Sequence, residues 1–213
     1  VLVAGHEQAR GLGVLVVMNA EVHCAWQVQK MHTGLVSAFR SPNGGSIAQI
    51  QEDTVRFYGC SVIDRPVIDR SNTDVHQPIP NTPVAVITAA LGDDGRIISN
   101  LSEMGFCGAV LEAMGGGSVP RAWIAPLELL AREMPIVYSS RTGAGATLLA
   151  TYGGWGGELS LQKLGVLPAG LLTPLKARLL LQLLLGRGCD RAQIRTAFDM
   201  FNEPQTTSRR LFY

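Results

Sequence analysis

Residues 115–120 form a Gly-Gly-Gly-Ser-Val-Pro loop, one of three places in the sequence whose residue types could do chemistry. The loop follows a predicted strand, and open α/β sheets tend to bind ligands at the carboxyl ends of their strands. The Ser118 hydroxyl can both donate and accept a hydrogen bond. The alternative is a plain glycine turn in which Ser118 lies near a helix N-terminus. A phosphate site is weakly supported, because the loop has neither a P-loop pattern nor a GxGxxG pattern.

Glu158 and Lys30 are the other two candidates. Glu158 ends the glycine-rich segment 152–158, and a carboxylate there could make a charge-assisted contact with an ammonium group. An exposed loop position is nevertheless the ordinary expectation for a glutamate. Lys30 is a lone lysine, for which a solvated loop is the ordinary environment. The residue types alone leave the roles of both side chains open.

The cysteines and histidines show no metal or redox pattern. The four cysteines lie far apart, with no CxxC pair and no histidine at metal-ligand spacing, which argues against a zinc site. We expect four buried thiols. The four histidines have no spacing that brings two to one helix face, so we expect them to be structural or exposed. These residues are Cys24, Cys60, Cys107 and Cys189, and His6, His23, His32 and His76.

The composition indicates a soluble globular protein. With 213 residues, 46% of them hydrophobic, the chain can bury a core and form one large or two small domains. A net charge of +1 and 16% charged residues provide no long-range field for nucleic acid or a membrane surface. The longest apolar stretch, residues 179–185, is interrupted by Gln182 and too short to span a bilayer. We expect the cytoplasm, with the periplasm as the alternative, because a chain without its natural start could not show a signal peptide.

The second part of the chain has the pattern of a βαβαβ unit. We predict strands at residues 84–89, 108–112 and 135–138, with helices at residues 95–104 and 120–133 between them. The crossover rule makes the connections right-handed and the sheet parallel.

Two further helices are predicted after this unit. Thr173 as N-cap, with Pro174 at the first helical position, starts a leucine-rich helix that Gly186 ends. Asp190 then caps a last helix with one apolar stripe. The stripe consists of Ile194, Ala197, Phe198 and Phe201.

The first part of the chain predicts strands followed by a linker. Residues 12–17 are almost continuously apolar, as expected for a strand covered on both faces. Residues 46–63 predict two strands around a polar turn at Glu52-Asp53. Residues 65–83 hold four prolines among polar residues and cannot sustain regular structure, so the interdomain linker is expected there.

The alternation of strands and helices predicts the α/β class, with two domains of mainly parallel sheets flanked by helices. The predicted boundaries give a first domain at residues 1–65, a linker at residues 66–83 and a second domain at residues 84–213. Such a chain needs its chemistry assigned from specific motifs, because the fold class hosts many functions.

Several motifs occur in a fixed order along the chain. An apolar run closes on Met18-Asn19, and the segments Lys30-Met31-His32-Thr33 and Phe39-Arg40-Ser41-Pro42-Asn43 follow. Later come residues 84–88, residues 105–113 and a Ser-Ser-Arg loop at residues 139–145. Residues 167–178 contain a GxLxPxKAR segment, the most specific of these signals. Together these segments cover residues 10–201 and resemble the bacterial L-asparaginases of the asparaginase/glutaminase family.

The resemblance implies a fold and an activity. It makes residues 1–65 the C-terminal part of the family's N-terminal domain, so the first domain is incomplete. It implies hydrolysis of L-asparagine, with glutamine as a second candidate substrate, to the acid and ammonia by a threonine nucleophile. No metal or organic cofactor is implied, and the family forms homotetramers with sites between subunits. Both threonines and the triad aspartate lie in the part of the family sequence that this chain lacks, so we expect the chain to be inactive alone.

The resemblance also assigns the three candidate residues. Lys30 aligns with the lysine of a Thr-Asp-Lys triad, where an ammonium beside the hydroxyl favours its nucleophilic form. Ser118 takes the place of an asparagine, or in some members a histidine, that reaches a neighbouring subunit's active site. Glu158 falls on a glutamate that a neighbouring subunit contributes to bind the substrate's α-amino group. The implied site is therefore Lys30 as catalytic residue with Ser118 and Glu158 as substrate-binding residues, and no metal.

The surroundings of Lys30 depart from the family pattern. The chain has Met18-Asn19-Ala20 where the family has Met-Asn-Asp, and residues 26–31 are Trp-Gln-Val-Gln-Lys-Met where it has Arg-Asp-Val-Thr-Lys-Thr. The loss of two carboxylates and two hydroxyls removes groups that would orient the lysine. These changes favour an alternative, a noncatalytic family member that binds a small amino acid or serves as an interaction subunit. A nucleotide-binding α/β domain is a third hypothesis, and it rests only on the glycine loops.

Overall fold

The computed structural model describes residues 1–58 and 81–202. The chain divides into two compact units, Val1–Arg65 with Pro204–Tyr213 and Pro66–Glu203. The described parts of these two, residues 1–58 and 81–202, are called the first unit and the second unit. Residues 66–80 of the linker predicted at residues 66–83 lie outside the described residues, as do Cys60 and His76.

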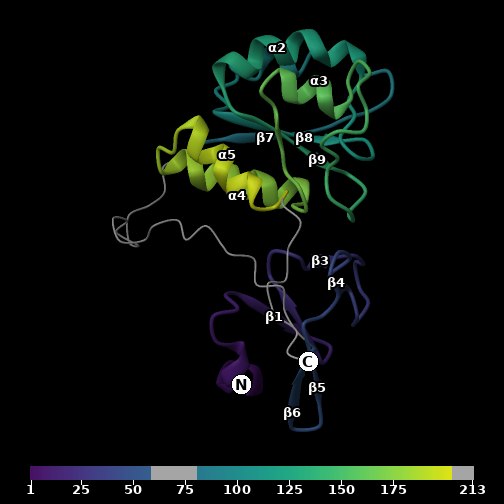
Figure 1. Ribbon diagram of the computed structural model, residues 1–213, viewed down its shortest axis with the longest axis vertical. Coiled ribbons are helices and arrows are strands. Elements are labelled where there is room, and N and C mark those ends of the chain that lie inside the picture. Colours follow the sequence, from purple (N-terminus) through teal and green to yellow (C-terminus); the bar gives the residue numbers. More distant parts are fainter. Residues whose placement is uncertain (59–80, 203–213) are drawn as a thin grey trace, which may run out of the picture. The chain divides into compact units, whose positions relative to one another are not determined.

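The first unit contains a four-stranded antiparallel sheet in the order β1-β2-β5-β6 (Figure 1). Strands β3 and β4 form a separate antiparallel pair. Six residues make up the buried apolar core of the unit, among them Val22, Cys24 and Ala48. The elements are α1 (Leu2–Gly5), η1 (Glu7–Ala9), β1 (Leu15–Met18), β2 (Glu21–Cys24), β3 (Gln29–Lys30), β4 (Phe39–Arg40), β5 (Ala48–Gln51) and β6 (Thr54–Phe57).

The prediction for residues 12–17 is wrong in one respect. The strand exists as β1, but it is the edge strand of an antiparallel sheet, and Val17 and Met18 at its end are exposed. An apolar run shows that a strand needs cover without showing which polypeptide segment covers it. The two strands predicted around Glu52-Asp53 are confirmed as β5 and β6.

A tight turn joins β1 to β2. Asn19 and Ala20 are its two central residues, and both have positive φ angles, 51° and 60°. This backbone is the type I′ turn, whose twist matches that of the flanking strands. Asparagine tolerates the left-handed region, whereas the Cβ atom of an alanine is strained there. The turn is therefore built with one well-suited residue and one poorly suited residue.

The second unit is built on a four-stranded parallel sheet in the order β10-β9-β8-β7. This confirms the α/β class and the predicted parallel βαβαβ arrangement of the second unit, whereas the sheet of the first unit is antiparallel and not parallel as predicted. The elements are β7 (Val84–Thr88), η2 (Ile98–Asn100), β8 (Gly108–Ala113), η3 (Arg121–Trp123), α2 (Ile124–Glu133), β9 (Ile136–Ser140), α3 (Glu158–Lys163), β10 (Leu167–Pro168), α4 (Pro174–Gly186) and α5 (Arg191–Asp199).

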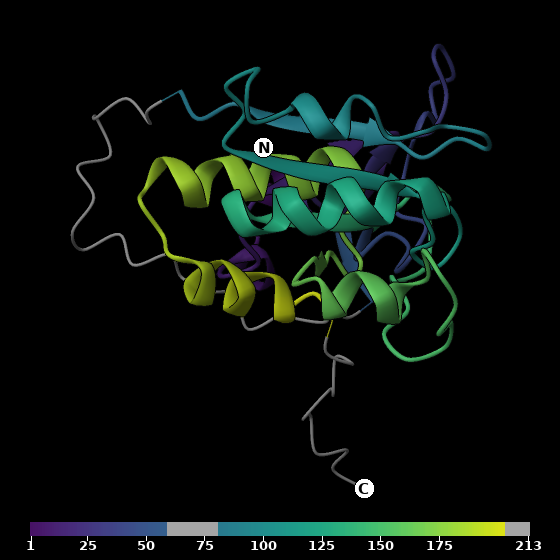
Figure 2. The ribbon, with the colours of Figure 1, turned by 90° about the horizontal axis from the view of Figure 1, so that it is seen from above.

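Helices cover both faces of the parallel sheet. Helices α2 and α3 lie on one face and α4 and α5 on the other (Figure 1), and α2 and α4 run along the strands (Figure 2). Alternate strand residues supply the two cores: Leu111 belongs to the α2 side and its neighbour Val110 to the α4 side. Burial on both faces explains why these strands are almost continuously apolar.

The last two helices begin as predicted. Thr173 is the N-cap of α4, with Pro174 in its first turn, and α4 ends at Gly186. Asp190 caps α5 by accepting from the Gln193 backbone N–H at 2.8 Å, within a capping box. The predicted apolar stripe faces inward, with Ile194, Ala197 and Phe198 buried and Phe201 partly buried.

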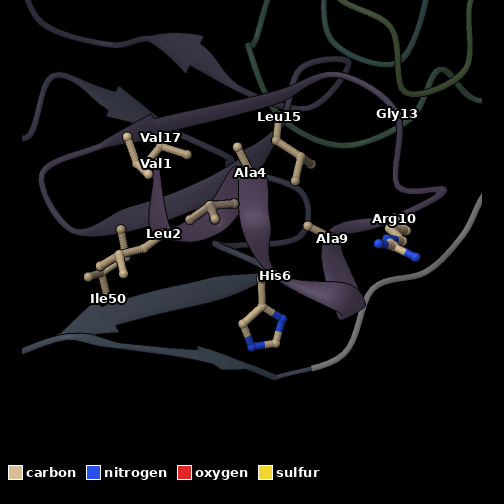
Figure 3. A pocket seen from close by; sticks show the side chains of 11 residues that line it. Val1, Leu2, Ala4, His6, Ala9, Arg10, Gly13, Leu15, Val17 and Ile50 are labelled. Atoms are coloured by element: carbon tan, nitrogen blue, oxygen red, sulfur yellow. The ribbon is translucent and has the colours of Figure 1, made fainter.

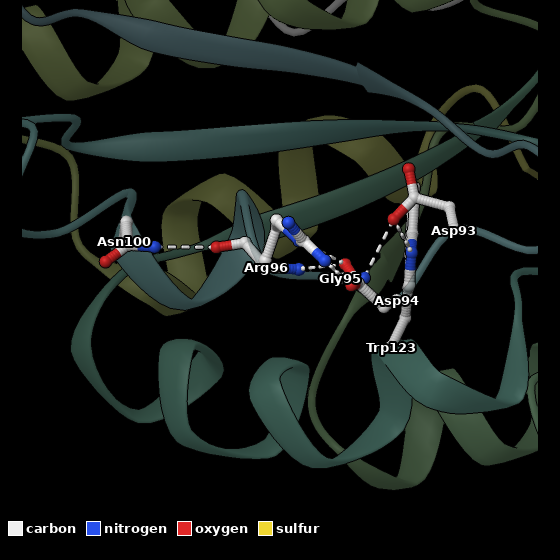
Figure 4. A network of polar contacts seen from close by, with 6 residues as sticks. All are labelled: Asp93, Asp94, Gly95, Arg96, Asn100 and Trp123. Atoms are coloured by element: carbon white, nitrogen blue, oxygen red, sulfur yellow. Dashed lines mark hydrogen bonds and ion pairs between the residues drawn. The ribbon is translucent and has the colours of Figure 1, made fainter.

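The helix predicted at residues 95–104 is only the short 3-10 turn η2. Glycines with positive φ, Gly95 and Gly105, bound this segment and do not continue a helix. Asp93 fixes its start: one carboxylate oxygen accepts from the Gly95 N–H at 2.8 Å and from the buried Trp123 indole N–H at 3.0 Å (Figure 4). The helix predicted at residues 120–133 begins as η3 before it becomes α2.

We expect the second unit to be the more stable of the two. Its apolar cores contain eighteen and twelve buried residues, against six in the first unit. Since stability follows the apolar surface removed from water, amide hydrogen exchange should show at least about tenfold greater protection in β7 to β9 than in β1 to β6. Equal protection in the two sheets would contradict this expectation.

The strained turn gives a second prediction. Replacement of Ala20 by glycine removes the Cβ strain at positive φ and should raise the free energy of unfolding of the first unit by about 0.5–1 kcal/mol. The matched control is Ala9→Gly in η1, where φ is not positive. This substitution should not raise the free energy of unfolding. Urea titration of both variants measures the difference, and a gain in the control as large as in Ala20→Gly would show that the turn is not strained.

Candidate functional site

The candidate site lies where β8 and β9 end, at the carboxyl edge of the parallel sheet. The loop after β8, residues 114–119, folds back on itself, with Met114 and Ser118 exchanging backbone hydrogen bonds of 2.8 and 2.9 Å. The loop after β9 reaches it twice: Leu148 N–H donates to the Gly116 carbonyl at 2.7 Å, and Val119 N–H donates to the Gly156 carbonyl at 2.8 Å. Two loops distant in sequence therefore form one wall.

Gly117 is the closest point between this wall and the sheet. Its φ is 138°, and a Cβ atom there would lie 2.7 Å from Tyr138 Cε2 and 3.4 Å from Glu158 Cβ. Only glycine combines this backbone conformation with this contact. The third glycine of the loop thus permits the close packing of Tyr138 and Glu158 against the loop that carries Ser118.

Glu158 is fully buried, at 0% exposure. It opens α3, and its Oε1 atom accepts hydrogen bonds from the Thr151 N–H at 2.6 Å and the Tyr152 N–H at 2.5 Å. Its other oxygen, Oε2, has no hydrogen-bond partner among the described residues. The expectation of an exposed loop glutamate is therefore wrong. One carboxylate oxygen anchors the loop, and the second is buried without a partner among the described residues.

Tyr138 lies beside this carboxylate. The ring is fully buried, and its hydroxyl donates to the Leu148 carbonyl at 2.9 Å and accepts from Gln162 Nε2 at 3.2 Å. Burial, and secondarily the charge of Glu158, raise the pKa of the Tyr138 phenol above its ordinary value. The phenol therefore stays neutral and keeps its donor role over the whole working pH range.

Ser118 is half-buried beside Gly117. Its backbone closes the turn with Met114, and its hydroxyl makes no hydrogen bond with another described residue. The glycine turn and the position of Ser118 just before η3 agree with the alternative of a plain turn near a helix start, although Pro120 and not Ser118 is the N-cap residue. The hydroxyl is thus uncommitted on a loop that packs against Glu158.

Lys30 belongs to the first unit. It ends β3, where it pairs with Phe39 of β4, and its side chain is exposed. Within residues 1–58 and 81–202 its ammonium group makes no hydrogen bond or ion pair. The side chain is therefore not oriented by a carboxylate or hydroxyl of this part of the chain.

Sequence reasoning missed Tyr138 and Gln162, because neither belongs to a recognisable motif. The Ser-Ser-Arg loop has a bracing role, since Arg141 Nη1 donates to the Ala89 carbonyl at 2.7 Å. Ser140 Oγ donates to the Gly115 carbonyl at 2.6 Å, which ties the end of β9 to the glycine loop. These contacts fix the loops without offering groups to a ligand.

The described cysteines and histidines differ in burial. Cys24 is buried and Cys189 partly buried, but Cys107 is exposed, so the prediction of four buried thiols is wrong for Cys107. His23 is buried, with Nδ1 3.0 Å from Ser41 Oγ. In the described part of the chain, no three His, Cys, Asp or Glu side chains gather closely enough to hold a metal ion. Every helix in that part is too short or too polar to cross a bilayer.

The close contact at Gly117 gives a testable expectation. Gly117→Ala should lower the free energy of unfolding of the second unit by about 2–4 kcal/mol, because the methyl group overlaps the Tyr138 ring and strains the backbone. Gly115→Ala is the matched control: its φ is also positive, but no atom lies within 4 Å of the added Cβ, so the cost should be about 1 kcal/mol. Equal losses in thermal or urea unfolding would contradict the packing argument.

Comparison with protein families finds two matches that together span most of the chain. The family model described as the glutaminase/asparaginase C-terminal domain matches residues 83–198. The model described as the asparaginase N-terminal domain matches residues 1–62. The first match includes the parallel sheet, the glycine loop and Glu158.

Curated relatives agree with this result. The chain is 32% identical over 202 residues to a probable periplasmic L-asparaginase of Haemophilus influenzae, covering 94% of this chain and 56% of the relative. It is 33% identical over 194 residues to a probable L-asparaginase of Deinococcus radiodurans, covering 90% and 56%. It is 28% identical to L-asparaginase 2 of Escherichia coli, covering 94% and 56%. The chain thus spans a little more than half the length of these relatives, and it belongs to the asparaginase/glutaminase family.

Proposed function

We propose that this chain forms the later part of an L-asparaginase-type amidohydrolase, which hydrolyses L-asparagine to L-aspartate and ammonia. L-Glutamine is the second candidate substrate, since one relative, from Pseudomonas aeruginosa, is named a glutaminase-asparaginase. The observation that carries the proposal is the buried Glu158 carboxylate, with Oε1 fixed by two backbone N–H groups and Oε2 unpartnered. An α-amino acid substrate brings the ammonium group that such an oxygen binds.

The surroundings of Glu158 support this role. A buried carboxylate with one oxygen unsatisfied is costly, and a cationic ligand group offsets that cost by a charge-assisted hydrogen bond. Because Oε1 is held by consecutive backbone N–H groups, the carboxylate does not need to reorganise when the ligand binds. The uncommitted Ser118 hydroxyl is a second polar group for the same substrate.

The nucleophile in this proposal is a threonine from a part of the family fold outside these 213 residues. Its oxygen attacks the side-chain amide carbon of the substrate, the C–N bond breaks, and ammonia leaves with the hydroxyl proton. Water then hydrolyses the resulting ester and releases aspartate and the free threonine. The Lys30 ammonium would favour the deprotonated nucleophile by its positive charge. We propose a homotetramer in which Ser118 and Glu158 serve the site of a neighbouring subunit.

The cytoplasm is the compartment we propose. Cys107 and Cys189 carry free thiols, as is usual in a reducing compartment. The Haemophilus influenzae relative is named as periplasmic, which is the alternative.

A noncatalytic amino-acid-binding or interaction protein is the second candidate. It is favoured by one observation, the exposed Lys30 with no polar partner in the described part of the chain. Gln29 and Met31 flank it where the family has threonines, so the groups that would orient a catalytic ammonium are absent.

Complementation tests the enzymatic proposal. Ammonia release from L-asparagine is measured for this chain alone and mixed with the N-terminal part of the Haemophilus influenzae relative, produced separately. We expect activity only in the mixture. Glu158→Gln keeps an oxygen for the two N–H groups but loses the charge, so kcat/KM of the mixture should fall about 10- to 100-fold, mainly through KM. The control Glu133→Gln, at an exposed position on α2, should change nothing.

Each remaining outcome assigns the function differently. Activity of the chain alone would show that a nucleophile lies within these residues. If the two parts are shown to associate and the mixture still releases no ammonia, the enzymatic proposal is contradicted. Calorimetric binding of asparagine without ammonia release would then support the amino-acid-binding alternative.

A further inference from the structure

An apolar pocket of about 490 Å³ opens on the first unit (Figure 3). Aliphatic side chains such as Leu2, Leu15 and Val17 make up most of its lining. The His6 ring in the lining is already engaged, since its Nδ1 accepts from the Gln8 N–H at 3.2 Å. A site for a polar molecule needs converging polar groups that set the orientation of the ligand. The surroundings of the buried carboxylate in the second unit meet this requirement better than the pocket does.

Residues 148–152, called the clamped segment below, lie in the loop between β9 and α3. Two side chains hold the carbonyl groups at its start. The Tyr138 hydroxyl donates to the Leu148 carbonyl at 2.9 Å, and Gln162 Nε2 donates to the Leu149 carbonyl at 2.9 Å. The start of the clamped segment is therefore tied to β9 through the tyrosine and to α3 through the glutamine.

The end of the clamped segment is bound to Glu158. The N–H groups of Thr151 and Tyr152 both donate to its Oε1 atom. Glu158 and Gln162 are four residues apart on α3, so their side chains leave the same face of the helix. One helix face thus holds both ends of the segment, the carbonyl end by an amide and the N–H end by a carboxylate.

The Tyr138 hydroxyl is the junction of these contacts. It accepts from Gln162 Nε2 at 3.2 Å while it donates to the Leu148 carbonyl, and the ring around it is fully buried. A Cβ atom at Gly117 would lie close to both the Tyr138 ring and Glu158 Cβ, so the two side chains pack against the same point of the glycine loop. Loss of the hydroxyl alone would leave Leu148 without this donor and Gln162 without this acceptor.

We propose that Tyr138 and Gln162 are positioning residues, which orient the Glu158 carboxylate for the substrate's ammonium group by holding the clamped segment. The direction of Oε1 follows from the two N–H groups that it accepts from, and the carbonyls held by Tyr138 and Gln162 lie only two to four residues before these groups. A carboxylate fixed in this way loses little freedom when a ligand binds. The inference rests on the proposed function, because it assigns both residues to the same site.

The first test measures the positioning in the chain by itself. Tyr138→Phe keeps the buried ring and removes only the hydroxyl. Hydrogen exchange of the Thr151 and Tyr152 N–H groups, followed by NMR, should become about tenfold faster, because opening the clamped segment then breaks fewer hydrogen bonds. Gln162→Met, which keeps the length of the side chain without its donors, should have the same effect.

Tyr58→Phe is the matched control. It also removes a tyrosine hydroxyl that is bonded to a glutamine, since Tyr58 donates to Gln49 Oε1 at 2.7 Å in the first unit. The exchange rates of the Thr151 and Tyr152 N–H groups should stay within about twofold, because this hydrogen bond does not involve the clamped segment. Circular dichroism verifies that all the variants fold.

The second test measures catalysis in the mixture with the N-terminal part of the Haemophilus influenzae relative. Tyr138→Phe should raise KM for L-asparagine about three- to tenfold and leave kcat within about twofold, because a contact with the ammonium group binds substrate and transition state alike. In the Glu158→Gln background the same substitution should change KM by less than about twofold, because the charge to be oriented is already absent. A general loss of stability would not depend on residue 158 in this way.

Three results would overturn the inference. They are unchanged exchange rates in both Tyr138→Phe and Gln162→Met, an active mixture whose KM does not respond to either substitution, and a KM effect of equal size with and without Glu158→Gln. Faster exchange in the chain, combined with a mixture that releases no ammonia even without substitutions, would contradict the proposed function. That result would still support the positioning of Glu158 by the two residues.

Discussion

The double hydrogen bond to Glu158 Oε1 is the interaction on which the loops of the second unit depend. A buried carboxylate is destabilising unless hydrogen-bonded, and the N–H groups of Thr151 and Tyr152 supply donors for one oxygen. Because Oε1 accepts from the N–H groups of two consecutive residues, these hydrogen bonds fix the loop after β9 relative to α3. That loop in turn meets the loop after β8, where only glycine at position 117 leaves room for Glu158 and Tyr138. The unpartnered Oε2 is thus held by packing and hydrogen bonds before any ligand arrives.

The two units differ in how their sheets are covered. The parallel sheet has helices on both faces, so its apolar strand residues are all enclosed by the unit itself. The antiparallel sheet has a small core, and its edge strand β1 carries apolar side chains that remain at the surface. The sequence of β1 is therefore more apolar than its surroundings in the described residues require.

The sequence predicts the second unit well for a physical reason. Strands buried on both faces are continuous apolar runs, and Thr173, Pro174 and Asp190 mark helix starts by local chemistry that tertiary structure does not override. The helix predicted at residues 95–104 fails because positive-φ glycines at 95 and 105 confine it to one turn. At the site, family motifs indicate Ser118 and Glu158, but not that Glu158 is buried. That burial arises from contacts with Gly117 and Tyr138, which lie 41 and 20 residues earlier in the chain.

Ala20 and Glu158 give opposite indications about catalysis. At position 20 the family's aspartate suits the left-handed turn and adds a carboxylate, whereas Ala20 sits there at a φ of 60° and provides neither. An alanine at that position does not favour the stability of the turn. At position 158 the chain keeps a buried carboxylate whose second oxygen has no partner among the described residues, an arrangement that costs stability. Residue 20 therefore departs from the family pattern at a cost in backbone strain, whereas residue 158 retains a carboxylate that packing and hydrogen bonds fix in place.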